Sequence, residues 1–312
     1  MSTAVRLGAY AIGLLALFAV ATGVGRAVGP VGSPAPEHSD AVEHGEDAAG
    51  HGEDAAHEEE AGHSDDGHEE PVAEIPGGLM VSDQGYTLSL TRTTLPSGSS
   101  TPVSFRILGP DGEPVTDYDV LHDKALHLIA VRRDLSGYQH VHPELGRDGV
   151  WRVPLSLTPG SWRVFADFAP AALEDNLILG ADVSVAGNYQ RRPLPPAADV
   201  TKVDGYTVTL EGELTPGEES ELTLSVSRGG EPVTDLEPYL DAYGHLVALR
   251  AGDLAYLHVH PAGEPGDGST QPGPEVTFFT NVPSPGEYRL FLDFKHEGVV
   301  RTAALTVRAG SS

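Results

Sequence analysis

From about residue 77 onward, the chain alternates apolar and polar residues in short runs. Clear examples are Tyr86–Thr91, Val103–Leu108, Trp151–Leu157 and Trp162–Phe168. A period of two residues is typical of half-buried β-strands, and Pro-Gly turn signals such as Thr158-Pro-Gly160 separate the runs. About seven short strands in ~100 residues favour an immunoglobulin-like β-sandwich over a larger barrel. We therefore expect an all-β fold.

The same order of motifs occurs twice. Gly85-Tyr-Thr87 recurs as Gly205-Tyr-Thr207, and the hexapeptide Gly-Glu-Pro-Val-Thr-Asp occurs at 112–117 and again at 230–235. Arg163-Val-Phe-Ala-Asp-Phe168 matches Arg289-Leu-Phe-Leu-Asp-Phe294. Self-similarity in constant order indicates a tandem duplication. We expect β-sandwich repeat 1 at 77–187, a linker at 188–200 and repeat 2 at 201–309.

Ahead of the repeats lies an uncharged apolar run, residues 7–25, between Arg6 and Arg26. Nineteen residues at ~1.5 Å per residue nearly span a hydrocarbon core of ~30 Å, which favours a transmembrane anchor within 1–28. Ala19-Val-Ala21 is also a possible cleavage site of a secretory signal peptide. We expect a single-pass cell-membrane protein with an extracytoplasmic globular part, or a secreted one if residues 1–21 are cleaved.

Residues 29–76 differ from the rest in composition. Residues 37–74 contain 15 acidic side chains and six histidines, and no Lys or Arg occurs from Ala27 to Thr91. The histidines are His38, His44, His51, His57, His63 and His68. With almost nothing apolar to bury, this linker should be disordered. It is either a low-affinity collector of divalent metal ions or a solvated spacer.

Composition narrows the chemistry. The formal net charge of −27 opposes binding to nucleic acid and favours cations as partners. The chain has no cysteine, which excludes disulfides, thiolate metal sites and thiol catalysis. The two methionines, Met1 and Met80, are too few for a thioether site. A bound metal must therefore be held by imidazole and carboxylate, which points to Cu(II), Zn(II) or Ni(II).

A three-histidine pattern is the strongest candidate for such a site. His-Val-His-Pro occurs at 140–143 and 258–261, and each copy follows a further histidine by thirteen residues. The candidate ligands are His127, His140 and His142 in repeat 1, and His245, His258 and His260 in repeat 2. Residues i and i+2 of a strand share a face, so the two imidazoles of His-x-His can hold one metal. The preceding histidine joins them only if its strand pairs with an odd register sum.

Two aspartates are candidate partners of these histidines. Asp167 and Asp293 stand at matching positions of a later strand, and either is a fourth ligand, a hydrogen-bond partner of a ligand, or a structural residue. Three imidazoles without thiolate suit Zn(II) or Cu(II) with one open position. The alternative for the histidines is a polar cluster at the sandwich edge. His122 and His296 have no equivalents between the repeats, and we treat them as surface residues.

These motifs carry a resemblance to a known family. The order Gly-Glu-Pro-Val-Thr-Asp, His-Leu, Pro-Gly-x-Trp/Tyr-Arg resembles the YtkA-like family of exported bacterial β-sandwich modules, over residues 78–308. His127-Leu-Ile-Ala-Val-Arg-Arg-Asp-Leu with Gln139-His-Val-His-Pro is similar to uncharacterised secreted or anchored actinobacterial proteins. The resemblance implies heavy-metal handling. YtkA-like modules have Met-x-x-Met-Gly-His before this strand, whereas the methionines are missing here.

Three classes of function follow. We expect a membrane-anchored extracytoplasmic protein that binds divalent metal, buffers or delivers copper or zinc to a transport partner, and is not an enzyme. A structural or interaction protein, with two sandwiches on a stalk and no ligand, is the alternative. A cupin-like enzyme is the third reading, because His258-x-His260 with Glu264 has the His-x-His-x-x-x-Glu spacing. Repeat 1 breaks that spacing with Glu144.

Overall fold

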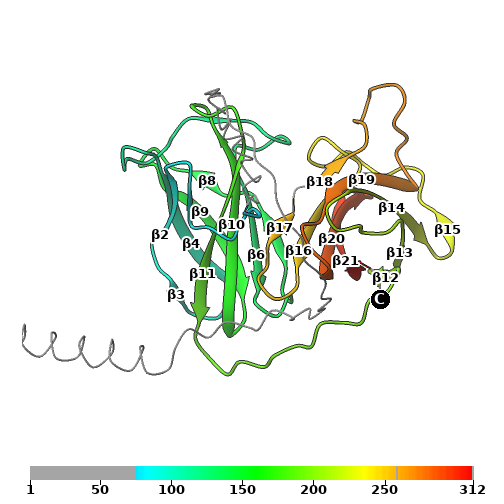
Figure 1. Cartoon of the computed structure of the whole chain (residues 1–312), viewed down its shortest axis with the longest axis horizontal. Helices are drawn as coiled ribbons and strands as arrows, with labels where there is room; N and C mark the ends of the chain where they lie inside the picture. Colours follow the sequence, from blue (N-terminus) through cyan, green and yellow to red (C-terminus); the bar gives the residue numbers. More distant parts are fainter. Residues whose placement is uncertain (1–74, 258, 311–312) are drawn as a thin grey trace, which may run out of the picture. The chain divides into compact units, whose positions relative to one another are not determined.

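The computed structural model describes residues 75–257 and 259–310, and this part of the chain is all-β (Figure 1). It forms two tandem immunoglobulin-like β-sandwiches, which confirms the fold expected from the alternating pattern. Among the described residues, no helix is long and apolar enough to cross a membrane. The expected anchor at 1–28, nearly all of the linker at 29–76, and His258 lie outside the described residues.

Repeat 1 contains two facing sheets. The first has the strand order β1-β2-β4-β9-β8, and the second has the order β3-β11-β10-β6-β7, with β5 pairing on β10. The strands of repeat 1 are β1 Ser82–Asp83, β2 Tyr86–Leu90, β3 Thr94–Leu95, β4 Gly98–Leu108, β5 Tyr118–Asp119, β6 His127–Arg132, β7 Gln139–Val141, β8 Glu144–Leu145, β9 Trp151–Leu157, β10 Gly160–Pro170 and β11 Leu177–Val185.

Repeat 2 follows the same plan. One sheet has the order β12-β13-β14-β19-β18, with β15 on β14, and the other has the order β17-β16-β20-β21. The strands of repeat 2 are β12 Val200–Val203, β13 Tyr206–Glu211, β14 Glu219–Arg228, β15 Glu231–Pro232, β16 His245–Arg250, β17 Tyr256–Leu257, β18 Val259–Pro261, β19 Glu275–Asn281, β20 Gly286–His296 and β21 Val299–Ala309.

Each sandwich has its own apolar core between its two sheets. In β9 every second residue is buried, as the sequence pattern predicts for a strand with one face in solvent. Trp151, Trp162 and Phe168 belong to the core of repeat 1, and Tyr206 and Phe294 belong to that of repeat 2. The alternation therefore accounts for most strands.

β6 and β16 do not alternate, because both of their faces are buried. All six residues of β6 are buried. Leu128 and Ala130 belong to the core of repeat 1, whereas Ile129 and Val131 join a third apolar cluster with residues of the second repeat. That cluster contains Ile129, Val131, Leu135, Phe165, Val247, Leu249, Leu254, Tyr256 and Phe291. The two repeats are thus joined through the outer faces of the β6 and β16 sheets.

Two aromatic contacts across this interface use equivalent residues, with the tyrosine from repeat 1 in one contact and from repeat 2 in the other. Tyr138 of repeat 1 stacks on Phe291 of repeat 2 with ring centroids 3.9 Å apart. Tyr256 of repeat 2 contacts Phe165 of repeat 1 at 5.6 Å. Tyr138 and Tyr256 are equivalent residues of the duplication, as are Phe165 and Phe291. An interface in which each partner offers the same residues to the other is the pattern of a two-fold related pair.

Candidate metal centre

The strands of this interface begin with histidine. His127 opens β6 and His245 opens β16. On the neighbouring strands, Asp167 of β10 is the register partner of His127, and Asp293 of β20 is the register partner of His245. Directly opposite residues in an antiparallel pair project to the same face. All four polar side chains therefore lie on the faces through which the two repeats meet.

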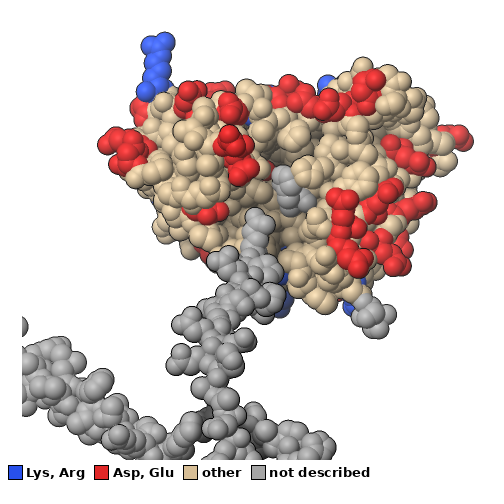
Figure 2. Space-filling model, turned by 45° about the horizontal axis from the view of Figure 1, so that its top comes forward, with Lys and Arg blue, Asp and Glu red and all other residues tan. Residues whose placement is uncertain are grey.

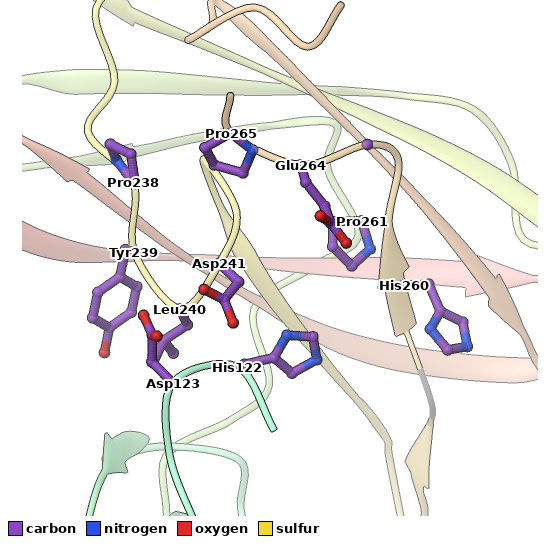
Figure 3. Close-up of a pocket in the computed structure, with 11 residues that line it drawn as sticks. His122, Asp123, Pro238, Tyr239, Leu240, Asp241, His260, Pro261, Glu264 and Pro265 are labelled. Carbon is purple, nitrogen blue, oxygen red and sulfur yellow. The ribbon is translucent and has the colours of Figure 1, made fainter. Parts of the chain in front are cut away.

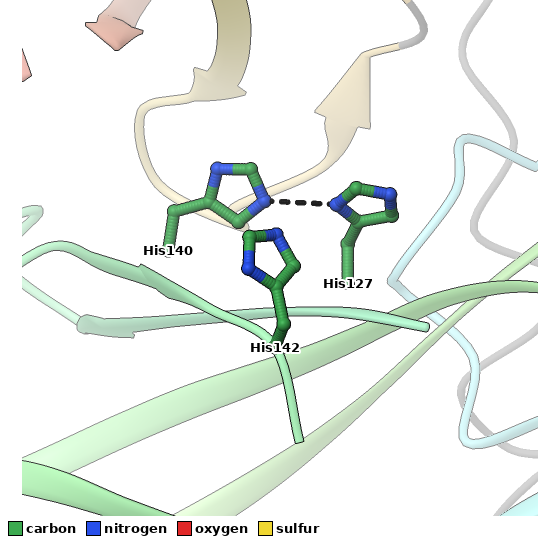
Figure 4. Close-up of side chains that lie close together, drawn as sticks. All are labelled: His127, His140 and His142. Atoms are coloured by element: carbon green, nitrogen blue, oxygen red, sulfur yellow. Dashed lines mark hydrogen bonds between the residues drawn. The ribbon is translucent and has the colours of Figure 1, made fainter. Parts of the chain in front are cut away.

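The register of the next hairpin brings more histidines to this face. β7 pairs with β6 so that Leu128 opposes Val141 and Ile129 opposes His140, which is the odd register sum that convergence requires. The ligand atoms of His127, His140 and His142 lie within 4.8 Å of one another. Figure 4 shows the three rings turned toward a common point, with Nδ1 of His127 3.1 Å from Nε2 of His140.

The outer nitrogens of two of these rings have partners that only accept hydrogen bonds. Nε2 of His127 donates to the carbonyl oxygen of Leu121 over 2.9 Å. Nδ1 of His140 donates to Oδ2 of Asp293 over 2.9 Å, from one repeat to the other. In neutral rings these bonds place the protons on the outer nitrogens. The two inner nitrogens, 3.1 Å apart, are then both acceptors and face each other without a proton between them.

Asp293 is itself held in place. Its other oxygen, Oδ1, accepts a hydrogen bond from the hydroxyl of Thr302, and its side chain is 2% exposed. A carboxylate that orients an imidazole from behind is the usual arrangement around metal-ligating histidines. The structure therefore places Asp293 behind His140 of the other repeat.

Two further ring nitrogens are buried without a hydrogen-bond partner among the described residues, Nε2 of His142 and Nδ1 of His245. Leaving a buried polar atom unpaired costs about 1–3 kcal/mol. The ring of His245 stacks on that of His127 at 5.8 Å and lies 4.8 Å from that of His140. His140, His245 and Asp293 form a second group whose ligand atoms lie within 4.8 Å of one another.

Burial keeps the imidazoles of His127, His142 and His245 neutral. Desolvation, together with the neighbouring imidazoles, lowers the pKa of His127 to about 3 and that of His142 to about 4. Burial also lowers the pKa of His245 well below its ordinary value of 6.5, again with help from neighbouring imidazoles. Neutral rings with free lone pairs are the form that binds divalent metals.

In repeat 2 the equivalent hairpin is broken earlier. Leu257 of β17 still pairs with β16, but β18 crosses to the other sheet, where His260 opposes Phe279 of β19. His260 is exposed. Because His258 lies outside the described residues, the expected second site of His245, His258 and His260 stays a prediction. Of those three, the structure brings His245 to the histidines of repeat 1.

Asp167 has a different environment from Asp293. It is half-buried, and its Oδ1 accepts a hydrogen bond from Nδ2 of Asn176 over 3.2 Å. Burial raises the pKa of Asp167. Asp167 and His245 both line a cavity of about 250 Å³ beside the three-histidine group.

Of the two histidines without equivalents between the repeats, His122 is exposed as expected and His296 is not. The ring of His122 lies 6.2 Å from that of His127 and 6.0 Å from that of His245, so it borders the cluster although its residue is exposed. His296, expected at the surface, is buried and bonded to the hydroxyl of Tyr206 and the carboxylate of Asp235. The sequence signal that could have placed His122 near the cluster is its position in a turn that both repeats share, five residues before the strand that begins with His127.

Comparison with known families gives one match that covers both sandwiches. The profile described as "Domain of unknown function (DUF8832)" matches residues 80–181 and 201–311. The chain belongs to the DUF8832 family. Each β-sandwich is one DUF8832 domain, and the three-histidine group of the first domain is completed by Asp293 and His245 of the second. The resemblance to YtkA-like modules stays a prediction, and no curated protein matches the chain.

Solved structures show only remote likenesses to the paired DUF8832 domains. The adhesin FdeC of Escherichia coli is 18% identical, with 74% of this chain and 65% of that chain covered and a TM-score of 0.23. The adhesin InvE of Yersinia pseudotuberculosis is 13% identical, with 72% and 59% covered and a TM-score of 0.23. The chain thus spans less than two thirds of either adhesin chain. Likenesses at these TM-scores carry no argument about function.

Proposed function

We propose that this chain binds one divalent metal ion, Cu(II) or Zn(II), between its two domains through His127, His140 and His142. The observation that carries the proposal is the pair of acceptor nitrogens of His127 and His140, facing each other at 3.1 Å while their outer nitrogens donate elsewhere. Two lone pairs at that distance repel in a dry site unless a cation or proton lies between them. A tetrahedral Zn(II), with Zn–N bonds of about 2.0–2.1 Å, places two nitrogens at a similar separation.

The remaining donors support the same conclusion. His142 supplies a buried nitrogen that has no other partner among the described residues, and His245 supplies one beside the group. With imidazole as the only nitrogen ligand type and no thiolate in the chain, borderline metals such as Zn(II) and Cu(II) fit best. Asp293 would hold the ring of His140 and increase its basicity. The ion would take its remaining position from His245 or water.

Metal binding without catalysis fits this arrangement, and we propose buffering or delivery outside the cytoplasm as the role. The N-terminal histidines would collect ions at lower affinity, and the inter-domain site would hold one more tightly. Membrane anchoring and a partner that receives the ion belong to the proposal as well.

A second candidate function is purely structural. The apolar cluster shared by the repeats, and the hydrogen bond from His140 to Asp293, already join the two domains. In that case the histidines would be a polar part of the inter-domain contact. The two domains would then form an interaction module on a stalk. The two proposals differ in whether the folded domains bind metal.

Equilibrium titration with Zn(II) and Cu(II) separates them. The protein is the full chain with its six N-terminal histidines, His38 to His68, replaced by Asn, so that the titration measures metal binding by the two domains. We expect one bound ion per chain, and its loss in His142→Ala, because no other described residue bonds Nε2 of that ring.

Asp293→Asn provides the finer test. It should weaken binding about 10–100-fold because the carboxylate behind His140 is lost. Asp235→Asn is the matched control, since Asp235 also bonds a histidine, His296, away from the cluster. Absence of binding by the unaltered domains would favour the structural role. Equal affinities for the two Asn variants would remove Asp293 from the site.

A further inference from the structure

A larger cavity opens beside the histidine cluster (Figure 3). It has a volume of about 800 Å³, and the described residues that line it come from three segments: one turn from each repeat, and the end of β18 with the loop that follows it. Its charged and imidazole side chains are those of His122, Asp123, Asp241, His260 and Glu264. No Lys or Arg is among the described residues that line it. The cavity is therefore built from ligand types that divalent cations prefer.

Two equivalent turns present the aspartates. In repeat 1 the turn is Leu121–Lys124, and in repeat 2 it is Tyr239–Ala242, each closed by backbone hydrogen bonds between its end residues. Both central residues have positive φ in each turn, including 63° for Asp123 and 60° for Asp241. This is the tight two-residue turn of a β-hairpin, in which Asp is well tolerated. The duplication thus places one carboxylate from each repeat at the same cavity.

The first central residue of each turn breaks the symmetry. Repeat 1 has His122 there, at φ 47°, and repeat 2 has Leu240, which is 4% exposed at φ 57°. Residues other than Gly, Asn and Asp rarely adopt this conformation, and such strain often marks a functional site. From this turn, the ring of His122 approaches both His127 and His245.

Two histidines connect this cavity with the inner one. His122 and His260 line the large cavity, and they also line the smaller cavity of about 250 Å³ that contains His127, His245 and Asp167. In that inner cavity, Nδ1 of His245 is buried without a hydrogen-bond partner among the described residues. From the large cavity inward, the carboxylates come first and the imidazoles of His122 and His260, which line both cavities, come next. The buried imidazoles of the proposed metal site follow.

We propose that the large cavity is the access route by which a divalent cation reaches the inter-domain site. Asp123, Asp241 and Glu264 attract the hydrated ion, and His122 and His260 replace part of its water before it reaches His245 and His127. This proposal rests on the proposed metal-binding function. Figure 2 shows many acidic and few basic side chains on the face in view, and the chain has a formal net charge of −27. Such a charge attracts cations, and the cavity concentrates that attraction near the site.

The experiment measures the rate of Zn(II) capture by stopped flow, with a metal indicator, in the full chain whose six N-terminal histidines are Asn. The triple variant Asp123→Asn, Asp241→Asn, Glu264→Gln is compared with Glu211→Gln, Glu213→Gln, Glu218→Gln. The control carboxylates are exposed and line neither cavity, and both variants remove three negative charges. A third variant, His122→Asn, tests the imidazole step.

We expect capture about tenfold slower in the cavity variant than in the control at low ionic strength, with the difference shrinking as salt is added. Equilibrium affinity should change less than twofold, because none of the three substituted carboxylates belongs to the three-histidine group. His122→Asn should slow capture and also release of Zn(II) to a competing chelator.

The outcomes separate the two proposals. If the cavity variant and the control capture Zn(II) at the same rate, the access route is refuted while the metal site stands. If the cavity variant loses equilibrium affinity and captures at the control rate, its carboxylates act at the bound ion, and the access route is again refuted. If the protein with all domain histidines intact takes up no Zn(II), both proposals fail together.

Discussion

At the scale of single residues, the decisive feature is how hydrogen bonds fix the histidine tautomers. His127 and His140 each donate from the outer nitrogen, to Leu121 and to Asp293 respectively. The sequence spacing of thirteen residues predicts that these rings meet if their strands pair with an odd register sum. It does not predict which nitrogen faces inward, because that depends on an acceptor six residues back and on another 153 residues ahead.

The depressed pKa of His127 leads to a prediction for the protein without metal. In the unfolded chain this ring titrates near its ordinary value of 6.5, and in the folded protein near 3. Above pH 6.5 both states are neutral, so stability does not depend on this ring. As the pH falls from 6.5 toward 3, the unfolded chain gains a proton that the folded protein does not. Stability should fall with it, by at most about 1.4 kcal/mol per pH unit for this group.

Urea unfolding of the metal-free protein at pH 7, 6 and 5 measures this dependence. The variant His127→Gln should show a shallower fall in unfolding free energy over that range, since its side chain does not titrate. An equal slope in both proteins would contradict the assignment of a neutral His127 in the folded state.

At the scale of elements, β6 and β16 are the strands through which the two sandwiches pack together. Their sequences, His-Leu-Ile-Ala-Val-Arg and His-Leu-Val-Ala-Leu-Arg, are continuous apolar runs between polar ends. Such runs are typical of strands buried on both faces. Their apolar composition indicates strands, and the uninterrupted pattern is the signal that a second apolar surface covers them.

Ile129 tests this burial directly. It points away from the core of its own sandwich and is fully buried against the second repeat. We expect Ile129→Ala to lower the free energy of unfolding by about 2–5 kcal/mol, as for a core residue. Glu221→Ala, at an exposed position of β14, should change it by no more than about 0.5 kcal/mol.

Chemical denaturation of both variants gives this comparison. A small effect for Ile129→Ala, equal to that of Glu221→Ala, would show that the two repeats are not packed through this face in solution.

At the scale of the whole molecule, the two repeats pack against each other through equivalent residues. The contacts of Tyr138 with Phe291 and of Tyr256 with Phe165 have exchanged roles, as in a two-fold symmetric dimer. The histidine cluster departs from this symmetry among the described residues. His142 belongs to the three-histidine group, whereas its equivalent, His260, is exposed and lines the large and the inner cavity.

A single repeat should therefore associate with itself. A fragment of residues 75–187 would expose Ile129, Val131 and Phe165, which the second repeat covers in the full chain. Contiguous exposed apolar surface of this kind promotes association, and a self-complementary face favours a dimer. Analytical ultracentrifugation should find dimers of this fragment, and monomers once Ile129→Glu is introduced. A monomeric unaltered fragment at micromolar concentration would contradict the prediction.

The sequence by itself determined the all-β fold and the two repeats, because these follow from alternation and self-similarity, and it predicted that His127, His140 and His142 converge on the condition of an odd register sum. All of them are local or depend on one hairpin. Only the tertiary structure decided that Asp293 supports a histidine of the other repeat, that His245 joins the first group, and that His122 borders it. These contacts come from the packing of two outer sheet faces, and spacing along one repeat contains no information about its orientation toward the next.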